Sequence, residues 1–130
     1  MVLITADEIY CANAGDSRTV MAEHGAAVDL SVDHKPDLPA EKDRVLRAGG
    51  EIKNDRVQGT LAMTRAIGDF DLKTAVPPKD ADASWFLDNQ PVTVVPEIVM
   101  KKLHKDIKFL VLACDGIWDC KTSEEAIEYF

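Results

Sequence analysis

The most informative part of the sequence is Leu110-Val-Leu-Ala-Cys-Asp-Gly-Ile-Trp-Asp119. Its apolar first half extends back to Ile107 and is typical of a central, buried strand. The strand runs directly into Asp115, and Gly116 then allows the backbone to change direction sharply. Asp119 follows four residues after Asp115. A carboxylate fixed at the end of a rigid strand suits a hard cation such as Mg²⁺ or Mn²⁺, because these ions prefer oxygen ligands.

These residues alone leave two interpretations open. An Asp-Gly pair after a strand is more often a turn than a metal site, and Asp119 would then be a solvated surface residue. The acidic turn Ala14-Gly-Asp-Ser-Arg18 has the same ambiguity, because Gly-Asp is common in hairpin turns. There Asp16 is either a ligand at a strand end or an ion-pair partner of Arg18. The local patterns do not decide whether the aspartates converge on one edge of a sheet.

The first third of the chain reads as short strands separated by turns. Strands are expected at residues 2–5, 9–14, 18–22 and 26–32, as an antiparallel meander. A helix is expected from Pro39 to Ala48, because proline suits the first turn and Gly49-Gly50 ends the helix. Leu38, Lys42, Val45, Leu46 and Gly49 would then share the face turned to the core, with Lys42 contributing only its stem.

The remainder of the chain returns to strands and one more helix. Residues 74–89, which include Pro77-Pro78, are expected to form a surface loop. Strands are expected at 92–95, 97–103 and 107–114. A helix begins at Thr122, where Glu125 lies three residues on and matches a capping box. The sequence therefore predicts an α+β protein with helices packed on antiparallel sheet.

Composition excludes several classes of partner. The formal net charge is −8, which argues against nucleic acid and against an anionic membrane surface. No apolar run approaches the ~20 residues that a membrane-spanning helix needs. Three cysteines without regular spacing do not indicate a disulfide framework, and Cys11 and Cys114 sit in apolar runs that predict burial. We therefore expect an intracellular protein, cytoplasmic or nuclear.

Six segments occur in a characteristic order: Asn13-Ala-Gly-Asp-Ser-Arg18, Asp33-His-Lys-Pro36, Glu41-Lys-Asp-Arg44, Ala48-Gly-Gly50, Arg65-Ala-Ile-Gly-Asp-Phe70 and Ala113-Cys-Asp-Gly-Ile-Trp-Asp119. This succession closely resembles the type 2C, metal-dependent serine/threonine protein phosphatases, and it covers nearly the whole chain. The resemblance implies part of an α-β-β-α sandwich, in which two antiparallel sheets flanked by helices carry a metal site at one end.

The resemblance also implies roles for individual residues. Asp115 matches an aspartate that binds one of two central Mg²⁺ or Mn²⁺ ions. Asp16 and Asp119 match aspartates that hold, together with Asp115, a third and more loosely bound ion. The helix from Pro39 and the loop after it resemble a flap beside the active site. Arg65 is expected to form a structural ion pair in preference to a contact with substrate.

The implied reaction is hydrolysis of phosphoserine or phosphothreonine in phosphorylated proteins, by a metal-activated water and without a protein nucleophile. Residues 1–130 would be the central and C-terminal part of a single catalytic domain, cut at both ends. The family's upstream aspartate-glycine-histidine-glycine segment, an acidic pair, a phosphate-binding arginine and the terminal aspartate-asparagine segment do not occur here. We therefore expect the isolated chain to bind metal weakly and to turn over poorly.

Two other readings remain open, and one is excluded. The chain could belong to a phosphatase-like module that binds or regulates without catalysis. It could also be a structural half that associates with another chain or with itself through exposed sheet edges. A cysteine-dependent phosphatase would need an arginine six residues after its cysteine, but Cys114 is followed at that distance by Cys120.

Overall fold

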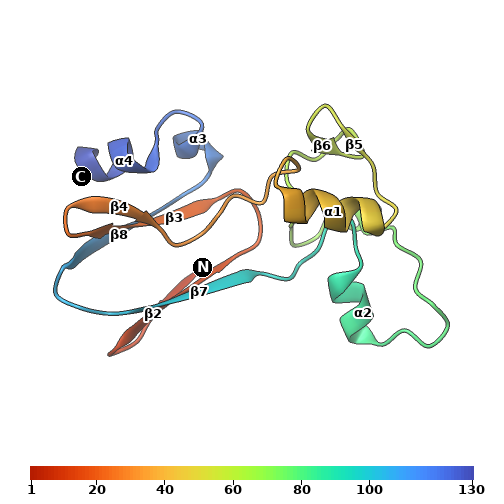
Figure 1. The fold of residues 1–130 in the computed structure, drawn as a ribbon, viewed down its shortest axis with the longest axis horizontal. Coiled ribbons are helices and arrows are strands. Elements are labelled where there is room, and N and C mark those ends of the chain that lie inside the picture. Colours follow the sequence, from red (N-terminus) through yellow and green to blue (C-terminus); the bar gives the residue numbers. More distant parts are fainter. The chain divides into compact units, whose positions relative to one another are not determined.

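The computed structural model describes the backbone of residues 1–130 and every side chain except that of Asp88. The chain divides into two compact units, each described by itself below (Figure 1). The first unit comprises Met1–Asp33 together with Glu97–Phe130, and the second comprises His34–Pro96. No helix among the described residues combines the length and apolar character needed to cross a membrane.

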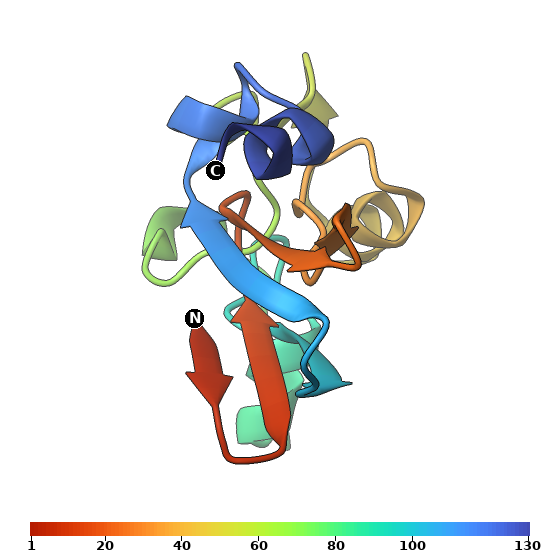
Figure 2. The same cartoon turned by 90° about the vertical axis from the view of Figure 1, so that its left-hand side faces the viewer.

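The first unit contains two three-stranded antiparallel sheets. The first sheet has the order β1 (Val2–Ile4), β2 (Glu8–Asn13), β7 (Glu97–Lys102). The second sheet has the order β4 (Ala26–Asp29), β3 (Arg18–Glu23), β8 (Ile107–Ala113). Figure 2 shows β1 and β2 joined as a hairpin. The predicted α+β class with antiparallel sheets is confirmed.

The first four strands were predicted to form one antiparallel meander. This prediction is wrong between β2 and β3, which do not pair. Instead the segment between them carries the chain from the first sheet to the second. Gly15 makes this crossing possible with a φ of 135°, which is accessible to glycine. As a result Cys11 of β2 and Met21 of β3 are both fully buried in one core cluster, to which Ile9 and Leu30 also belong.

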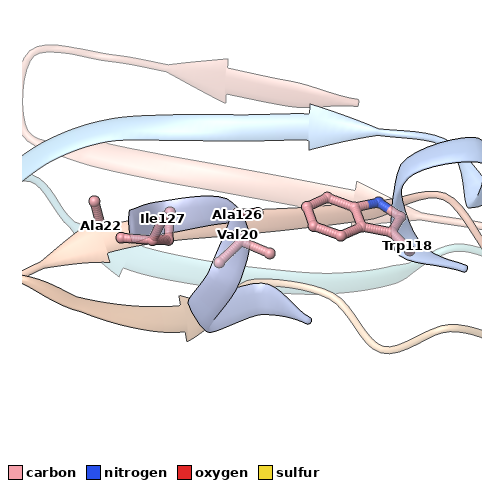
Figure 3. Packing of buried hydrophobic residues seen from close by; sticks show 5 residues of the cluster. All are labelled: Val20, Ala22, Trp118, Ala126 and Ile127. Carbon is pink, nitrogen blue, oxygen red and sulfur yellow. The ribbon is translucent and has the colours of Figure 1, made fainter. Parts of the chain in front are cut away.

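Two helices pack on the second sheet. The single turn α3 (Asp115–Trp118) follows β8, and α4 (Ser123–Tyr129) follows α3. Figure 3 shows Val20 and Ala22 of β3 packed with Trp118, Ala126 and Ile127. The capping box that begins α4 is confirmed: the Thr122 hydroxyl accepts from the Glu125 N–H, and the Glu125 carboxylate accepts from the Thr122 N–H.

β8 differs from its prediction as a central, buried strand. Among the strands that the structure describes, it pairs only with β3 and forms the edge of the second sheet. Leu112 is 53% exposed, whereas its neighbours Val111 and Ala113 are partly buried. Cys114, predicted to be buried, is exposed because it lies beyond the end of β8, whereas Cys11 is buried as expected.

The second unit is built from short elements around one small core. Its elements are α1 (Pro39–Arg47), β5 (Ile52–Lys53), β6 (Arg56–Val57), the 3-10 turn η1 (Phe70–Leu72) and α2 (Ala83–Asp88). Val45, Val57, Ala66 and Val92 form the buried cluster. Helix α1 is confirmed, but its core face is not as predicted, because Glu41 and Val45 are buried while Lys42 and Leu46 are exposed.

Two further expectations for this unit are wrong. The predicted loop at 74–89 contains α2, which Asp82 caps by accepting from the Trp85 N–H. The predicted strand at 92–95 is reduced to a single bridge between Thr93 and Arg65. Pro91 and Pro96 flank this segment, and proline cannot donate to a sheet ladder.

Candidate functional site

Two of the predicted metal ligands flank paired positions of the second sheet. β3 and β8 run antiparallel, and Arg18 lies opposite Ala113. Asp16 precedes Arg18 by two residues, and Asp115 follows Ala113 by two residues. Because the partners are antiparallel, the start of β3 and the end of β8 meet at one end of the sheet. The register therefore brings Asp16 and Asp115 to the same end.

Asp119 is tied to Asp115 through the one-turn helix α3. Asp115 is the first residue of α3, and Asp119 is its C-cap, whose N–H donates to the Asp115 carbonyl at 2.8 Å. Residues four apart on a helix lie on one face, so both carboxylates project from the same side of this turn. Both are exposed, whereas Asp16 is only 7% exposed.

The structure does not gather the three aspartates into a preformed cluster. Among the side chains that it describes, no three His, Cys, Asp or Glu residues lie close enough to hold a metal ion together. The carboxylates are nevertheless oxygen ligands of the kind that Mg²⁺ and Mn²⁺ take, so the type of donor fits. The assignment of Asp16, Asp115 and Asp119 as ligands stays a prediction.

Arg18 braces this end of the sheet. Its guanidinium makes two hydrogen bonds of 2.9 Å to the carboxylate of Asp33, and these raise the pKa of Arg18. It also donates to the Ser123 hydroxyl at 3.2 Å, which in turn donates to Asp29 at 2.6 Å. The carboxylate that pairs with Arg18 in these bonds belongs to Asp33, beyond the turn. These bonds fix β3 to α4.

A polar hollow of about 520 Å³ opens beside this network. Arg18, Asp29, Trp118, Asp119 and Lys121 contribute to its walls. The hollow therefore has both signs of charge and one of the predicted ligands on its surface. Such a lining can accept a small, charged and hydrated group.

A second set of charged residues lies within the second unit, around Glu41. Glu41 is 3% exposed and accepts hydrogen bonds from Arg44 at 2.6 Å, from the Thr64 hydroxyl at 2.5 Å and from Arg65 at 2.6 Å. Burial opposes ionisation of Glu41, but the hydrogen bonds from Arg65, Thr64 and Arg44 outweigh it and lower the pKa to about 2. Arg65 thus makes the structural ion pair that the sequence predicts.

The sequence reasoning missed Glu41 as a buried anion. Its spacing from Arg44 could have indicated an ion pair, because residues three apart on a helix such as α1 share a face. Arg44 continues the network by donating to the Thr64 carbonyl at 2.6 Å. The Thr64 N–H donates to the His34 carbonyl at 2.8 Å, and His34 is buried, as expected of a structural histidine.

Comparison with known proteins places these features in a family. The sequence matches the family model of Protein phosphatase 2C over residues 1–129. The chain belongs to the protein phosphatase 2C family. Protein phosphatase 2C homolog 3 of Schizosaccharomyces pombe is 48% identical over 129 residues, which cover 99% of this chain and 29% of that protein. Probable protein phosphatase 2C 11 of Oryza sativa is 45% identical, over 99% of this chain and 34% of its own length.

Solved structures of phosphatases share the fold. A phosphatase from Toxoplasma gondii superposes with a TM-score of 0.74 at 34% identity, over 92% of this chain and 35% of its own. Serine-threonine phosphatase 2C from the same organism gives a TM-score of 0.77 at 25% identity, over 98% of this chain and 43% of its own. The chain spans about a third of the length of the curated protein phosphatase 2C relatives that it matches.

Proposed function

We propose that these residues are part of a catalytic domain that hydrolyses phosphoserine and phosphothreonine in proteins with the help of Mg²⁺ or Mn²⁺. The proposal depends on one observation above all. In a chain of this family, the β3–β8 register brings the carboxylate-bearing residues Asp16 and Asp115 to the same end of a sheet. The family match supports phosphatase chemistry, and this register supports the choice of Asp16 and Asp115 as two of the ligands.

Asp115 would hold one of two central ions, and Asp16 and Asp119 would join it around a third. When bound, such ions supply hydroxide near neutral pH and offset the negative charge on the phosphoryl oxygens. The protein's own contribution is to position the carboxylates. Asp115 is held by the end of β8, and α3 is fixed by Trp118, whose indole N–H donates to the Ala113 carbonyl at 2.7 Å.

In this proposal Arg65 does not contact the substrate. Its guanidinium is engaged by Glu41 and by the Val95 carbonyl at 3.1 Å. Its role is to fix the segment around Thr64 within the second unit. The 130-residue chain alone supplies only part of the carboxylates that the family site needs, so we expect it to bind Mn²⁺ weakly and to hydrolyse phosphopeptides poorly.

A chimera tests whether these residues support catalysis in a complete domain. The matched segment of the Schizosaccharomyces pombe relative is replaced by residues 1–129 of this chain. We expect Mn²⁺-dependent release of phosphate from a phosphothreonine peptide. The Asp115→Asn chimera should lose activity by about 100-fold or more, because a central ligand is removed. The matched control is Asp7→Asn, an exposed aspartate in the turn between β1 and β2.

Circular dichroism and thermal unfolding establish that each chimera is folded. A folded chimera without activity, beside an active parent enzyme, would contradict the proposal and favour a non-catalytic binding or regulatory module. Equal activity of the Asp115→Asn and Asp7→Asn chimeras would remove Asp115 from the site. The isolated 130-residue chain is assayed in parallel, and a rate equal to that of the chimera would refute its expected incompleteness.

A further inference from the structure

The turn that carries Asp16 is anchored at both ends to one pair of consecutive residues. Asn13, the last residue of β2, comes just before this turn, and Arg18, the first residue of β3, comes just after it. The side chain of Asn13 bonds to Val32, and the side chain of Arg18 bonds to Asp33. The backbone on either side of Asp16 is therefore fixed to the same short segment after β4.

Asn13 fixes the first end of the turn with one side-chain amide. Its Nδ2 donates to the Gly15 carbonyl at 3.1 Å and to the Val32 carbonyl at 3.2 Å. An amide nitrogen has two N–H donors, so both are used here. Glycine has more backbone freedom to lose than any other residue, and Gly15 has a φ of 135°. The bond to its carbonyl thus restricts the residue directly before Asp16.

Arg18 fixes the second end of the turn with its guanidinium. Nε and Nη2 donate to the two carboxylate oxygens of Asp33, each at 2.9 Å. A two-pronged contact of this kind sets the orientation of both planar groups. The next residue adds a further bond between the same segments, because the Thr19 N–H donates to the Ser31 hydroxyl at 3.0 Å. The start of β3 is therefore tied to the chain after β4 over several residues.

The burial of Asp16 makes its carboxylate depend on this backbone. Asp16 is 7% exposed. A buried side chain in a closely packed environment has little room to change its rotamer. The position of the carboxylate therefore follows the position of the turn, and whatever fixes the turn also fixes the predicted ligand.

We propose that Asn13 and Arg18 are positioning residues for the ion that Asp16 is expected to hold. Neither residue is a ligand in this proposal. Together they set the turn so that the Asp16 carboxylate is in place before an ion binds, which reduces the ordering that binding would otherwise cost. The inference rests on the proposed function, because that function supplies the ion.

Mn²⁺ binding to the chimera with the Schizosaccharomyces pombe relative tests this role directly. The electron paramagnetic resonance signal of unbound Mn²⁺ measures the dissociation constants, starting from metal-free protein. Asp16→Asn identifies the ion that Asp16 holds, because the dissociation constant of that ion should rise. Asn13→Ala should raise the same constant by about tenfold, although it changes no charge.

A double variant separates positioning from a general loss of structure. When Asp16→Asn is already present, Asn13→Ala should raise the dissociation constant by less than about twofold, because its effect passes through Asp16. A merely structural role would add the same factor with and without Asp16. Thermal unfolding without metal checks that each variant is folded.

Arg18→Lys is a second, independent variant. Lysine keeps the positive charge but cannot make the two-pronged contact with Asp33, so the same dissociation constant should rise by about fivefold or more. The matched control is Asn89→Ala. The Asn89 amide also donates to a backbone carbonyl, that of Trp85 at 2.9 Å, but it lies in the second unit. Its removal should change Mn²⁺ binding by less than about twofold.

Folded Asn13→Ala and Arg18→Lys chimeras that bind Mn²⁺ as the unchanged chimera does would overturn the proposal. An effect of Asn13→Ala that is equally large with and without Asp16 would also overturn it. If Asp16→Asn leaves every Mn²⁺ dissociation constant unchanged, Asp16 is not a ligand and the inference fails with it. Mn²⁺-dependent phosphate release by the unchanged chimera would still support the proposed function in each of these cases, so the two failures are distinguishable.

Discussion

The guanidinium carbon of Arg18 lies 5.2 Å from the centroid of the Trp118 ring. A cation over an indole face is attracted by the ring's quadrupole. Arg18 begins β3, two residues after Asp16, and Trp118 ends α3, between Asp115 and Asp119. This contact therefore links the two chain segments that carry the predicted ligands. It holds these segments in place through residues that neighbour the predicted ligands.

Trp118→Phe should destabilise the first unit by about 1–2 kcal/mol, because the ring is kept while the indole hydrogen bond to Ala113 is lost and the cation–π contact weakens. Urea denaturation followed by far-UV circular dichroism measures the free energy of unfolding. Trp85→Phe is the control, since Trp85 lies in the second unit and its ring packs edge to face against Phe86. An unchanged unfolding midpoint in Trp118→Phe would show that neither contact contributes to stability.

Mn²⁺ should stabilise the isolated chain only slightly. A ligand at a concentration equal to its dissociation constant raises the free energy of unfolding by only about 0.4 kcal/mol. Thermal unfolding at increasing Mn²⁺ measures this shift. Asp115→Asn should abolish the shift, while Asp7→Asn should keep it. A large shift that survives Asp115→Asn would place the bound ion elsewhere.

The second unit should lose stability in acid through Glu41. Its pKa is about 2 when folded and near 4.5 when unfolded, so the lowered value is a stabilising contribution above pH 4.5. The contribution is about 3 kcal/mol and disappears as the pH falls from 4.5 towards 2. The chain has two tryptophans, so the fluorescence of Trp85 in a Trp118→Phe background reports the second unit. In Glu41→Gln, the free energy of unfolding of the second unit should change much less with pH between 4.5 and 2.

Glu41 and Arg65 should also be strongly coupled. Arg65→Met leaves a buried carboxylate with fewer donors, and it should cost about 3 kcal/mol or more. Glu41→Gln leaves both arginines without their anion and should cost a similar amount. The double variant lacks both the buried carboxylate of Glu41 and the guanidinium of Arg65. Its loss of unfolding free energy should therefore be well below the sum of the losses in the two single variants. Additive costs would show that the 2.6 Å contact between them contributes little.

The sequence predicted the elements with strong local signals. Pro39 and Gly49-Gly50 bracket α1, and Thr122 with Glu125 marks the start of α4, because capping is decided by neighbouring residues. It also predicted that Arg65 forms an ion pair. Periodicity could not predict the burial of Glu41, since a carboxylate is buried only when partners from distant segments arrive, here Thr64 and Arg65.

Pairing between strands was harder to predict from the sequence. The turn after Asn13 looks like a hairpin, but a glycine turn can equally carry the chain to another sheet, and that choice depends on which faces share a core. β8 reads as central from its apolar run, yet in this chain it is an edge. The candidate site also depends on strand pairing. The sequence suggested Asp16 and Asp115 as ligands, but only the register of β3 with β8 shows that they lie at the same end of the sheet.

The capping box of α4 should control how firmly that helix covers the second sheet. Thr122→Ala removes the acceptor for the Glu125 N–H and should cost about 1 kcal/mol. Thr122→Ser keeps the hydroxyl and should cost much less. The control is Thr74→Ala, an exposed residue of the second unit. Trp118 fluorescence in a Trp85→Phe background follows unfolding of the first unit, because Trp118 packs in the same cluster as Ala126 of α4. Equal losses in Thr122→Ala and Thr122→Ser would mean that the hydroxyl does not hold the helix start.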